Sequence, residues 1–189
     1  MKFGLKFKFY IPILFLSLSN ILLPGRVSAQ DLSPTVERDT LLSAAREYMH
    51  SARFCALITI DESGSSHART MDPFDPDENM IVWLGTNRNS RKVREIKNNP
   101  NVTLFYTQNK GVGYVSIIGN ATIVDDKEKK SELWKNEWKN FYDKGKENYV
   151  LIKVVPARLE LLNFNLGISG DKYTWKTPAV EFDSMNNEK

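Results

Sequence analysis

The chain has 189 residues, with 26 Lys and Arg, 23 Asp and Glu, and one cysteine, which suits one domain with its own core and excludes a disulfide framework. Its formal net charge of +3 comes from residues 1–29, because removing their four basic residues and no acidic ones leaves 3 − 4 = −1. The remaining 189 − 29 = 160 residues are near neutral and give no global argument for binding nucleic acid or an anionic membrane.

Residues 1–29 have the pattern of a signal peptide. Three lysines lie among the first eight residues, residues 10–23 are mostly apolar, and small residues precede Ala29. The apolar run is too short and too polar for a stable membrane anchor. We therefore expect cleavage after about Ala29 and export, to the periplasm, with residues 30–164 forming one domain and residues 165–189 a partly disordered C-terminal extension.

The first half of the exported chain predicts one helix and three strands. Apolar residues repeat at helical spacing over residues 34–51. Residues 54–60 and 67–71 are β-rich and flank a turn sequence, which indicates a hairpin, and residues 80–85 form a third strand. Cys55 lies in the first apolar strand with no histidine nearby, so we expect a buried core residue rather than a nucleophile.

The second half predicts a helix from Ser90 to residue 98, before Pro100. Strands follow over residues 102–107 and 113–124, the second with a bulge or bend at Gly119.

A charged helix is expected over residues 126–142, with Leu133, Trp134, Trp138 and Phe141 as its apolar stripe. Two strands then flank Pro156, over residues 149–155 and 158–164. The tail from Asp183 is polar, and we expect it to be disordered.

Six or seven strands with few helices exclude a doubly wound sheet, because parallel strands need a crossover helix between almost every pair. The expected fold class is therefore mainly β: an antiparallel, Greek-key-like β-barrel with a few helices.

The segment GTNRNSRKVREIKNNP, residues 85–100, carries five Lys and Arg residues. Ser90 at a helix start, followed by Arg91 and Lys92, combines a hydroxyl, free backbone N–H groups and two cations, as a phosphate site requires. Thr86 adds a second hydroxyl. A solvated helix face is an equal alternative, and we assign Arg94 and Lys97 to that face. A nucleic-acid patch is the weakest reading, because a short segment cannot follow a phosphate backbone.

Arg69 lies in the middle of a predicted strand, where a cation is costly unless it faces solvent or pairs with an anion. If this strand lies beside residues 80–85, Arg69 converges with Arg91 and Lys92 on one anion. Trp83 and Tyr114 suit the wall of a flat ring, although ordinary packing explains each of them as well.

The order of ARTM, VWLGTNRNSRKVREIKNNPNVTLFY and GYVSIIGNATIV resembles the pyridoxamine 5'-phosphate oxidase-like family of FMN-binding split β-barrels. The resemblance covers about residues 35–164. Its most specific part is Thr-x-x-x-Ser-Arg-Lys followed by Glu-Ile-x-x-Asn-Pro. The length of the chain and its Leu133-Trp134 pair are more similar to the general stress protein branch than to the true oxidases.

The resemblance implies a homodimer that binds FMN, without covalent attachment, in clefts at the subunit interface. It implies that Arg69 and Lys92 hold the phosphate and that Arg91, Ser90 and Thr86 complete the cradle.

Four further residues are implied at the isoalloxazine ring. Thr70 and Met71 would run beside it, and Gly85 would let the backbone approach it. Tyr114 stands where the oxidases carry a glutamine, so its contact with the flavin is open.

The residues that hold vitamin B6 in the oxidases do not match. A lysine follows the arginine-bearing strand in the oxidases, whereas this chain reads Asp72-Pro-Phe-Asp75, and the C-terminal Arg-x-His of the oxidases is absent. We therefore expect no vitamin B6 oxidase activity.

Two functions remain open: an exported FMN-dependent oxidoreductase of unknown substrate, and a non-catalytic flavin- or haem-binding stress-response protein. Deazaflavin and haem are the alternative cofactors. No catalytic residue and no metal site are assigned. His67, beside the arginine-bearing strand, is a candidate acid or base, but exposure at a hairpin mouth is the simpler explanation.

Overall fold

The computed structural model describes residues 36–108, 112–142 and 147–183. The expected signal peptide and the tail beyond Asp183 lie outside these residues. No helix in the described ranges has both the length and the apolar character that a bilayer span requires.

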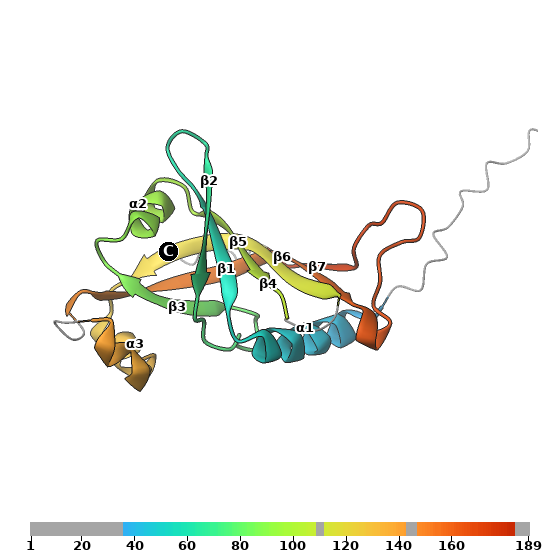
Figure 1. The fold of residues 1–189 in the computed structure, drawn as a ribbon, viewed down its shortest axis with the longest axis horizontal. Helices are drawn as coiled ribbons and strands as arrows, with labels where there is room; N and C mark the ends of the chain where they lie inside the picture. Colours follow the sequence, from blue (N-terminus) through green and yellow to red (C-terminus); the bar gives the residue numbers. More distant parts are fainter. Residues whose placement is uncertain (1–35, 109–111, 143–146, 184–189) are drawn as a thin grey trace, which may run out of the picture. The chain divides into compact units, whose positions relative to one another are not determined.

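The described chain is mainly antiparallel β-sheet with three α-helices (Figure 1). The α-helices are α1 (Arg38–Ala52), α2 (Arg91–Asn98) and α3 (Lys127–Glu132), and 3-10 turns are η1 (Asn136–Asn140) and η3 (Phe164–Leu166). The strands are β1 (Cys55–Ile60), β2 (Ser66–Met71), β3 (Val82–Asn87), β4 (Asn101–Tyr106), β5 (Gly113–Val124), β6 (Tyr149–Asn163) and β7 (Ala179–Glu181).

The strand order is β2-β1-β4-β5-β6-β3, and β7 pairs with β6 off this path. The expected antiparallel, mainly β class is confirmed and fits a split barrel. The sheet is not closed: β2 and β3 are its two ends. In the described residues a bridge between Pro73 and Leu84 joins the segment after β2 to β3, with Phe74 N–H donating to the Trp83 carbonyl at 2.9 Å.

The β1–β2 hairpin is confirmed, and its turn is held by one carboxylate. Asp61 Oδ1 accepts from the backbone N–H groups of Ser63 and Ser65 at 2.9 and 3.0 Å. Gly64 has φ +82°, a left-handed conformation that glycine adopts without steric penalty. In Figure 1 this hairpin rises beside α2, which packs against β1 and β5.

One inward-facing row of residues runs across the sheet. Leu57, Leu104, Ile117, Leu159 and Val180 are consecutive cross-strand partners, and none is more than 3% exposed. Each such side chain contributes about 1.5–3 kcal/mol by leaving water.

This row continues into β2 at Arg69, the partner of Leu57. A cation therefore occupies the end of an otherwise apolar row.

Helix α1 covers this core and contacts β4, β5 and β7. The helix was expected from residue 34 but begins at Arg38, and Val36 and Glu37 before it are not helical. Its buried face includes Leu41, Tyr48 and Met49.

Cys55 is 3% exposed, as expected. Burial raises the pKa of its thiol to about 12, so the thiolate is scarce at neutral pH.

The prediction of two strands around Pro156 is wrong, because β6 is continuous from Tyr149 to Asn163. Pro156 pairs with Gly119 where the β5–β6 register shifts after Ile118. A bulge is a place where a strand tolerates a residue without an N–H donor. The irregularity expected at Gly119 is thus confirmed, and it accommodates the proline.

The single helix expected over residues 126–142 is also wrong. Asp126 caps α3 by accepting from Lys129 N–H at 2.7 Å, but α3 ends at Glu132 and η1 follows.

Packing explains this break. The Trp134 and Trp138 rings both pack on Tyr149, with centroids 5.4 and 5.6 Å away. Phe141, expected in the apolar stripe, is 78% exposed.

The segment after residue 164 contributes to the core through Ile168 and Val180. It returns as β7 along β6, where Leu161 N–H donates to the Pro178 carbonyl at 3.1 Å. Ile168 and β7 therefore pack with the sheet, whereas Tyr173 and Trp175 between them are exposed.

Candidate functional site

The turn between β3 and α2 brings two hydroxyls and a lysine into contact. The Oγ atoms of Thr86 and Ser90 lie 3.3 Å apart, and Lys92 Nζ donates to Thr86 Oγ1 at 3.1 Å. The Ser90 side chain makes no capping hydrogen bond to α2, so its hydroxyl belongs to this cluster. Three of the predicted phosphate-binding residues are therefore neighbours.

Lys92 is half-buried and lies near two arginines and one carboxylate. Burial lowers the pKa of its ammonium group, and the charges of Arg69 and Arg91 lower it further, while Glu95 acts in the opposite direction. An anion close to Lys92 would offset both effects, because an opposite charge favours the protonated ammonium.

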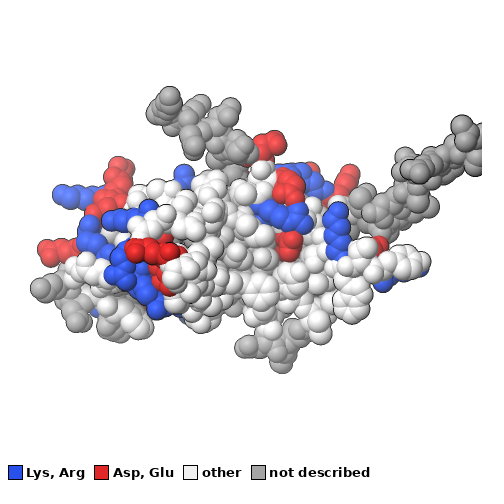
Figure 2. Space-filling view, turned by 90° about the horizontal axis from the view of Figure 1, so that it is seen from above, with Lys and Arg blue, Asp and Glu red and all other residues white. Residues whose placement is uncertain are grey.

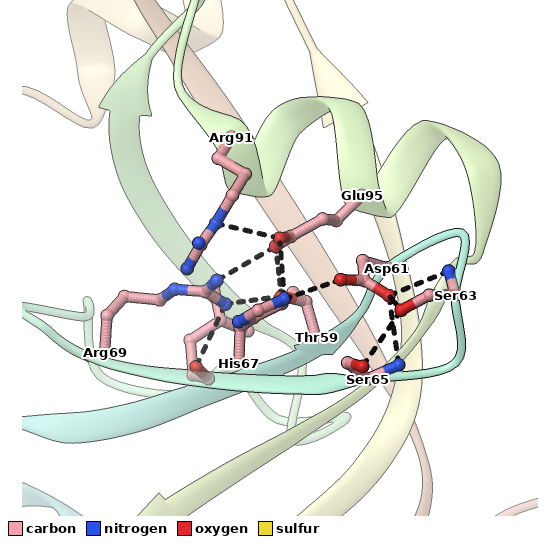
Figure 3. Close-up of polar contacts among 9 residues, drawn as sticks. Thr59, Asp61, Ser63, Ser65, His67, Arg69, Arg91 and Glu95 are labelled. Atoms are coloured by element: carbon pink, nitrogen blue, oxygen red, sulfur yellow. Dashed lines mark hydrogen bonds and ion pairs between the residues drawn. The ribbon is translucent and has the colours of Figure 1, made fainter.

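Arg69 and Arg91 converge on one carboxylate, Glu95 (Figure 3). Arg69 NH2 donates to Glu95 Oε2 at 2.9 Å, and Arg91 Nε lies 3.0 Å from Glu95 Oε1. Thr59 Oγ1 also donates to Glu95 Oε2, at 2.5 Å. Arg69 and Arg91 therefore meet at one carboxylate of the chain itself, whereas Lys92 donates to Thr86.

The expected route to this convergence was wrong. β2 forms no ladder with β3 in the described chain, since its ladder partner is β1. Arg69 on β2 and Arg91 on α2 meet because α2 packs against β1, which places Glu95 within reach of Arg69.

Sequence reasoning missed Glu95, which is 3% exposed. Burial alone raises the pKa of this carboxyl group, but the Thr59 hydrogen bond and the charges of Arg69 and Arg91 outweigh it, so the pKa lies below its ordinary value. The available signal was the i,i+4 spacing of Arg91 and Glu95, which is typical of a helical ion pair. That signal does not reveal burial, which depends on Arg69.

The solvated face of α2 is as expected, because Arg94 and Lys97 are exposed. On the same helix Lys92 is half-buried and Glu95 is buried, while Arg94 and Lys97 face water.

His67 is half-buried and pairs with Asp61, with 2.7 Å between His67 Nε2 and Asp61 Oδ2. Hydrogen bonds from Ser63 and His67 hold the pKa of Asp61 well below its usual range. His67 Nε2 also lies 3.9 Å from Glu95 Oε1. The histidine is thus part of the charged cluster rather than a freely exposed side chain.

An open pocket of about 490 Å³ lies between the hairpin turn and α2. Its lining residues are charged or polar: Asp61, Glu62, Ser63, His67, Arg91, Arg94, Glu95 and Asn98. Arg91, whose side chain is 56% exposed, therefore borders open space next to the buried carboxylate.

The residues predicted beside a flavin ring do not form one group. Met71 is 9% exposed and belongs to the core, whereas Thr70 is exposed on the opposite face of β2. Tyr114 packs on Phe105, with ring centroids 5.2 Å apart, and its hydroxyl lies 2.9 Å from Thr177 Oγ1.

Gly85 faces an aromatic cluster. A Cβ at this position would lie 2.5 Å from ring atoms of both Trp138 and Tyr149. The missing side chain of Gly85 therefore makes room for these rings, which is a packing reason for glycine independent of any cofactor.

A family model described as "Pyridoxamine 5'-phosphate oxidase like" matches residues 42–161, from α1 to β6, including the β3–α2 turn. The chain belongs to the pyridoxamine 5'-phosphate oxidase-like family. Its sequence is similar to General stress protein 26 of Bacillus subtilis (strain 168), with 28% identity over 106 residues that cover 54% of this chain and 74% of that protein.

Solved structures agree with this assignment. General Stress Protein 26 from Bacillus anthracis is 27% identical, with a TM-score of 0.57 and coverage of 65% of this chain and 93% of that one. A related protein from Clostridium acetobutylicum has a TM-score of 0.64 at 19% identity, covering 78% and 98%. An FMN binding protein from Nostoc punctiforme has a TM-score of 0.54 at 16% identity, covering 81% and 98%. The last two likenesses show the fold.

We predict that Gly85→Ala lowers the free energy of unfolding by about 1–3 kcal/mol, because the added methyl collides with Trp138 and Tyr149. Denaturant unfolding measures this loss. In a Trp138→Phe background the smaller ring leaves more room, so the same substitution should be less costly. Unchanged stability combined with lost flavin binding would show instead that Gly85 serves the cofactor.

Proposed function

We propose that the chain is an exported FMN-binding protein that holds the flavin phosphate at the β3–α2 turn. The observation that carries the proposal is the gathering of three cations with the hydroxyls of Thr86 and Ser90. The cations are Arg69, Arg91 and Lys92. Membership of the family and the FMN-binding relative from Nostoc punctiforme support it.

The charge of the cluster fits a phosphate monoester. The three cations and the carboxylate of Glu95 have a net charge of +2, by the count 3 − 1 = 2, which leaves out the Asp61 carboxylate that pairs with His67. A phosphate monoester carries about −1.5 to −2 at pH 7. Guanidinium groups and hydroxyls are also the donors that phosphate oxygens prefer.

FMN would supply the redox chemistry when bound, and the chain would bind and orient it. An FMN-dependent oxidoreductase of unidentified substrate is our leading proposal. Reduction of the bound flavin by NAD(P)H during turnover would separate this enzyme from a non-catalytic binder.

Vitamin B6 oxidation is not part of this proposal. Asp72, in the region where the oxidases carry a substrate lysine, accepts a hydrogen bond from Lys135 Nζ at 2.8 Å. Trp138 Nε1 donates to its other oxygen at 3.3 Å. Both contacts attach Asp72 to the segment that carries Lys135 and Trp138.

Nucleic-acid binding is also outside the proposal. On the face drawn in Figure 2, the described Lys and Arg side chains are interleaved with Asp and Glu and form no continuous basic stripe. Such a stripe is the usual electrostatic footprint of nucleic-acid binding.

We predict that the purified chain binds FMN and that Arg91→Ala with Lys92→Ala weakens binding by about tenfold or more, because charged hydrogen bonds to phosphate are lost. Flavin fluorescence titration measures the affinity, and an absorption spectrum of the preparation distinguishes flavin from haem. The matched control is Arg94→Ala with Lys97→Ala, which removes two charges from the solvated face of the same helix. Equal effects of the two double variants would refute the assigned cradle.

The resemblance also leads us to propose a homodimer, and one surface suits it. The outer face of β1, β2, β4 and β5 carries half-buried or exposed uncharged side chains: Ala56, Ile58, Ala68, Thr70, Thr103, Phe105, Tyr114 and Ile118. A second copy on this face would lie next to Thr70 and Tyr114, which would bring both residues to a cleft between subunits. An uncharged centre is typical of subunit interfaces.

We predict that Ile118→Arg converts a dimer to monomer, because it would bury an unpaired charge in the interface. Ile118 is 42% exposed in the single chain, so the substitution should leave the fold of the monomer intact. Sedimentation or light scattering measures the mass. Ser51→Arg, on the exposed end of α1, is the control. A dimer that persists with Ile118→Arg would place the interface elsewhere.

Export to the periplasm is proposed from the sequence of residues 1–29. A non-covalently bound FMN would then join the chain after export. The mature protein from a periplasmic extract should begin at about Gln30, and intact-mass measurement checks this. Retention of residues 1–29 in that fraction would contradict the proposal.

A further inference from the structure

Glu95 occupies a position where a carboxylate is costly. It lies on the buried side of α2, 3% exposed, and Figure 3 shows it between the hairpin strands and the helix. A buried carboxylate is tolerated only when cations and hydrogen bonds replace its lost water. Here Thr59, Arg69 and Arg91 take that role, and each of them contacts a Glu95 oxygen.

The guanidinium of Arg69 is fixed by three acceptors. NH1 donates to Thr59 Oγ1 at 2.5 Å and to the Leu57 carbonyl at 3.3 Å, and NH2 donates to Glu95 Oε2 at 2.9 Å. A guanidinium carries five N–H donors in one plane. These three hydrogen bonds within the described chain fix the plane of the Arg69 guanidinium. They do not use its Nε–H or the second N–H of NH2.

Arg91 is held through a single nitrogen. Its Nε faces Glu95 Oε1 at 3.0 Å, and no other ion pair of its side chain is found among the described residues. Its two terminal amino groups lie on a side chain that borders the open pocket. Glu95 thus supplies one of the three acceptors that hold Arg69 and forms the ion pair that holds Arg91 at its Nε.

We propose that Glu95 is a positioning residue of the phosphate cradle. Its buried carboxylate, with Thr59, orients Arg69 and Arg91 before the phosphate binds. This inference rests on the proposed function, in which the two arginines hold FMN.

Preorientation strengthens binding because the arginines do not lose side-chain freedom when the anion arrives. Glu95 also leaves the cradle with a net charge that matches a phosphate monoester.

Two simpler roles for Glu95 give different results. If Glu95 acted only as a negative charge near the anion, its neutralisation would tighten FMN binding. If it only stabilised the fold, its neutralisation would weaken the binding of every flavin equally. Positioning of the phosphate grip predicts a selective loss for ligands that carry phosphate.

The test compares FMN with riboflavin, which has the same ring and no phosphate. Glu95→Gln keeps the shape of the side chain and removes its charge. We expect its affinity for FMN to fall about tenfold, as for the loss of a charge-assisted hydrogen bond. Its affinity for riboflavin should change by less than about twofold, because riboflavin has no phosphate for the arginines to hold. The ratio of the two dissociation constants is the readout.

Thr59 provides a second, milder variant in case Glu95→Gln does not fold. Thr59→Val removes the hydroxyl that bonds both Glu95 and Arg69, whereas Thr59→Ser keeps it. We expect the preference for FMN over riboflavin to fall in Thr59→Val and to persist in Thr59→Ser. Circular dichroism verifies the fold of each variant.

An unchanged FMN-to-riboflavin ratio in folded Glu95→Gln or Thr59→Val, or tighter FMN binding, would overturn the inference while leaving FMN binding intact. A parent chain that binds neither flavin would overturn the proposed function itself. The two failures are therefore distinct.

Discussion

The pairing of a buried carboxylate with cations from two separate elements is the interaction on which the site depends. Arg69 ends a row of inward-facing residues that is otherwise apolar, and Arg91 begins α2. Glu95 pairs with both, so charge as well as apolar packing fixes α2 against the hairpin. Without an anionic partner, Arg69 would have to leave the interior. The same helix presents Lys92 to the hydroxyls of Thr86 and Ser90.

Local patterns were enough to predict most of the fold. Alternating apolar residues predicted the strands, and the Asp61-to-Gly64 turn predicted the hairpin that the structure contains. The hydroxyls and the lysine of the β3–α2 turn were also predictable, because they are close in sequence and are brought together by one turn. Arg69 stood out as a cation inside a predicted strand, and the resemblance to the family implied its phosphate role, although no local pattern relates its position to α2.

The errors share a physical cause, which is contact between distant parts of the chain. Pro156 was taken as the end of a strand, but it is opposite Gly119 at a register shift where its missing donor is harmless. The helix expected over residues 126–142 breaks because tryptophans pack on Tyr149. Glu95 was missed because a charged residue on a helix is normally solvated. Its burial becomes favourable only when Arg69 arrives from a strand 26 positions away.

The open ends of the sheet have a thermodynamic consequence. Arg69 comes from β2 at one end, and Thr86 comes from β3 at the other. A ligand that contacts both residues would join the two ends of the sheet, which the described chain links through the bridge between Pro73 and Leu84. Its binding would then be coupled to closure of the sheet, and saturation at about 100 times the dissociation constant adds about 2.7 kcal/mol to the stability of the folded state. Occupancy of such a site would therefore be measurable as a rise in the stability of the folded chain.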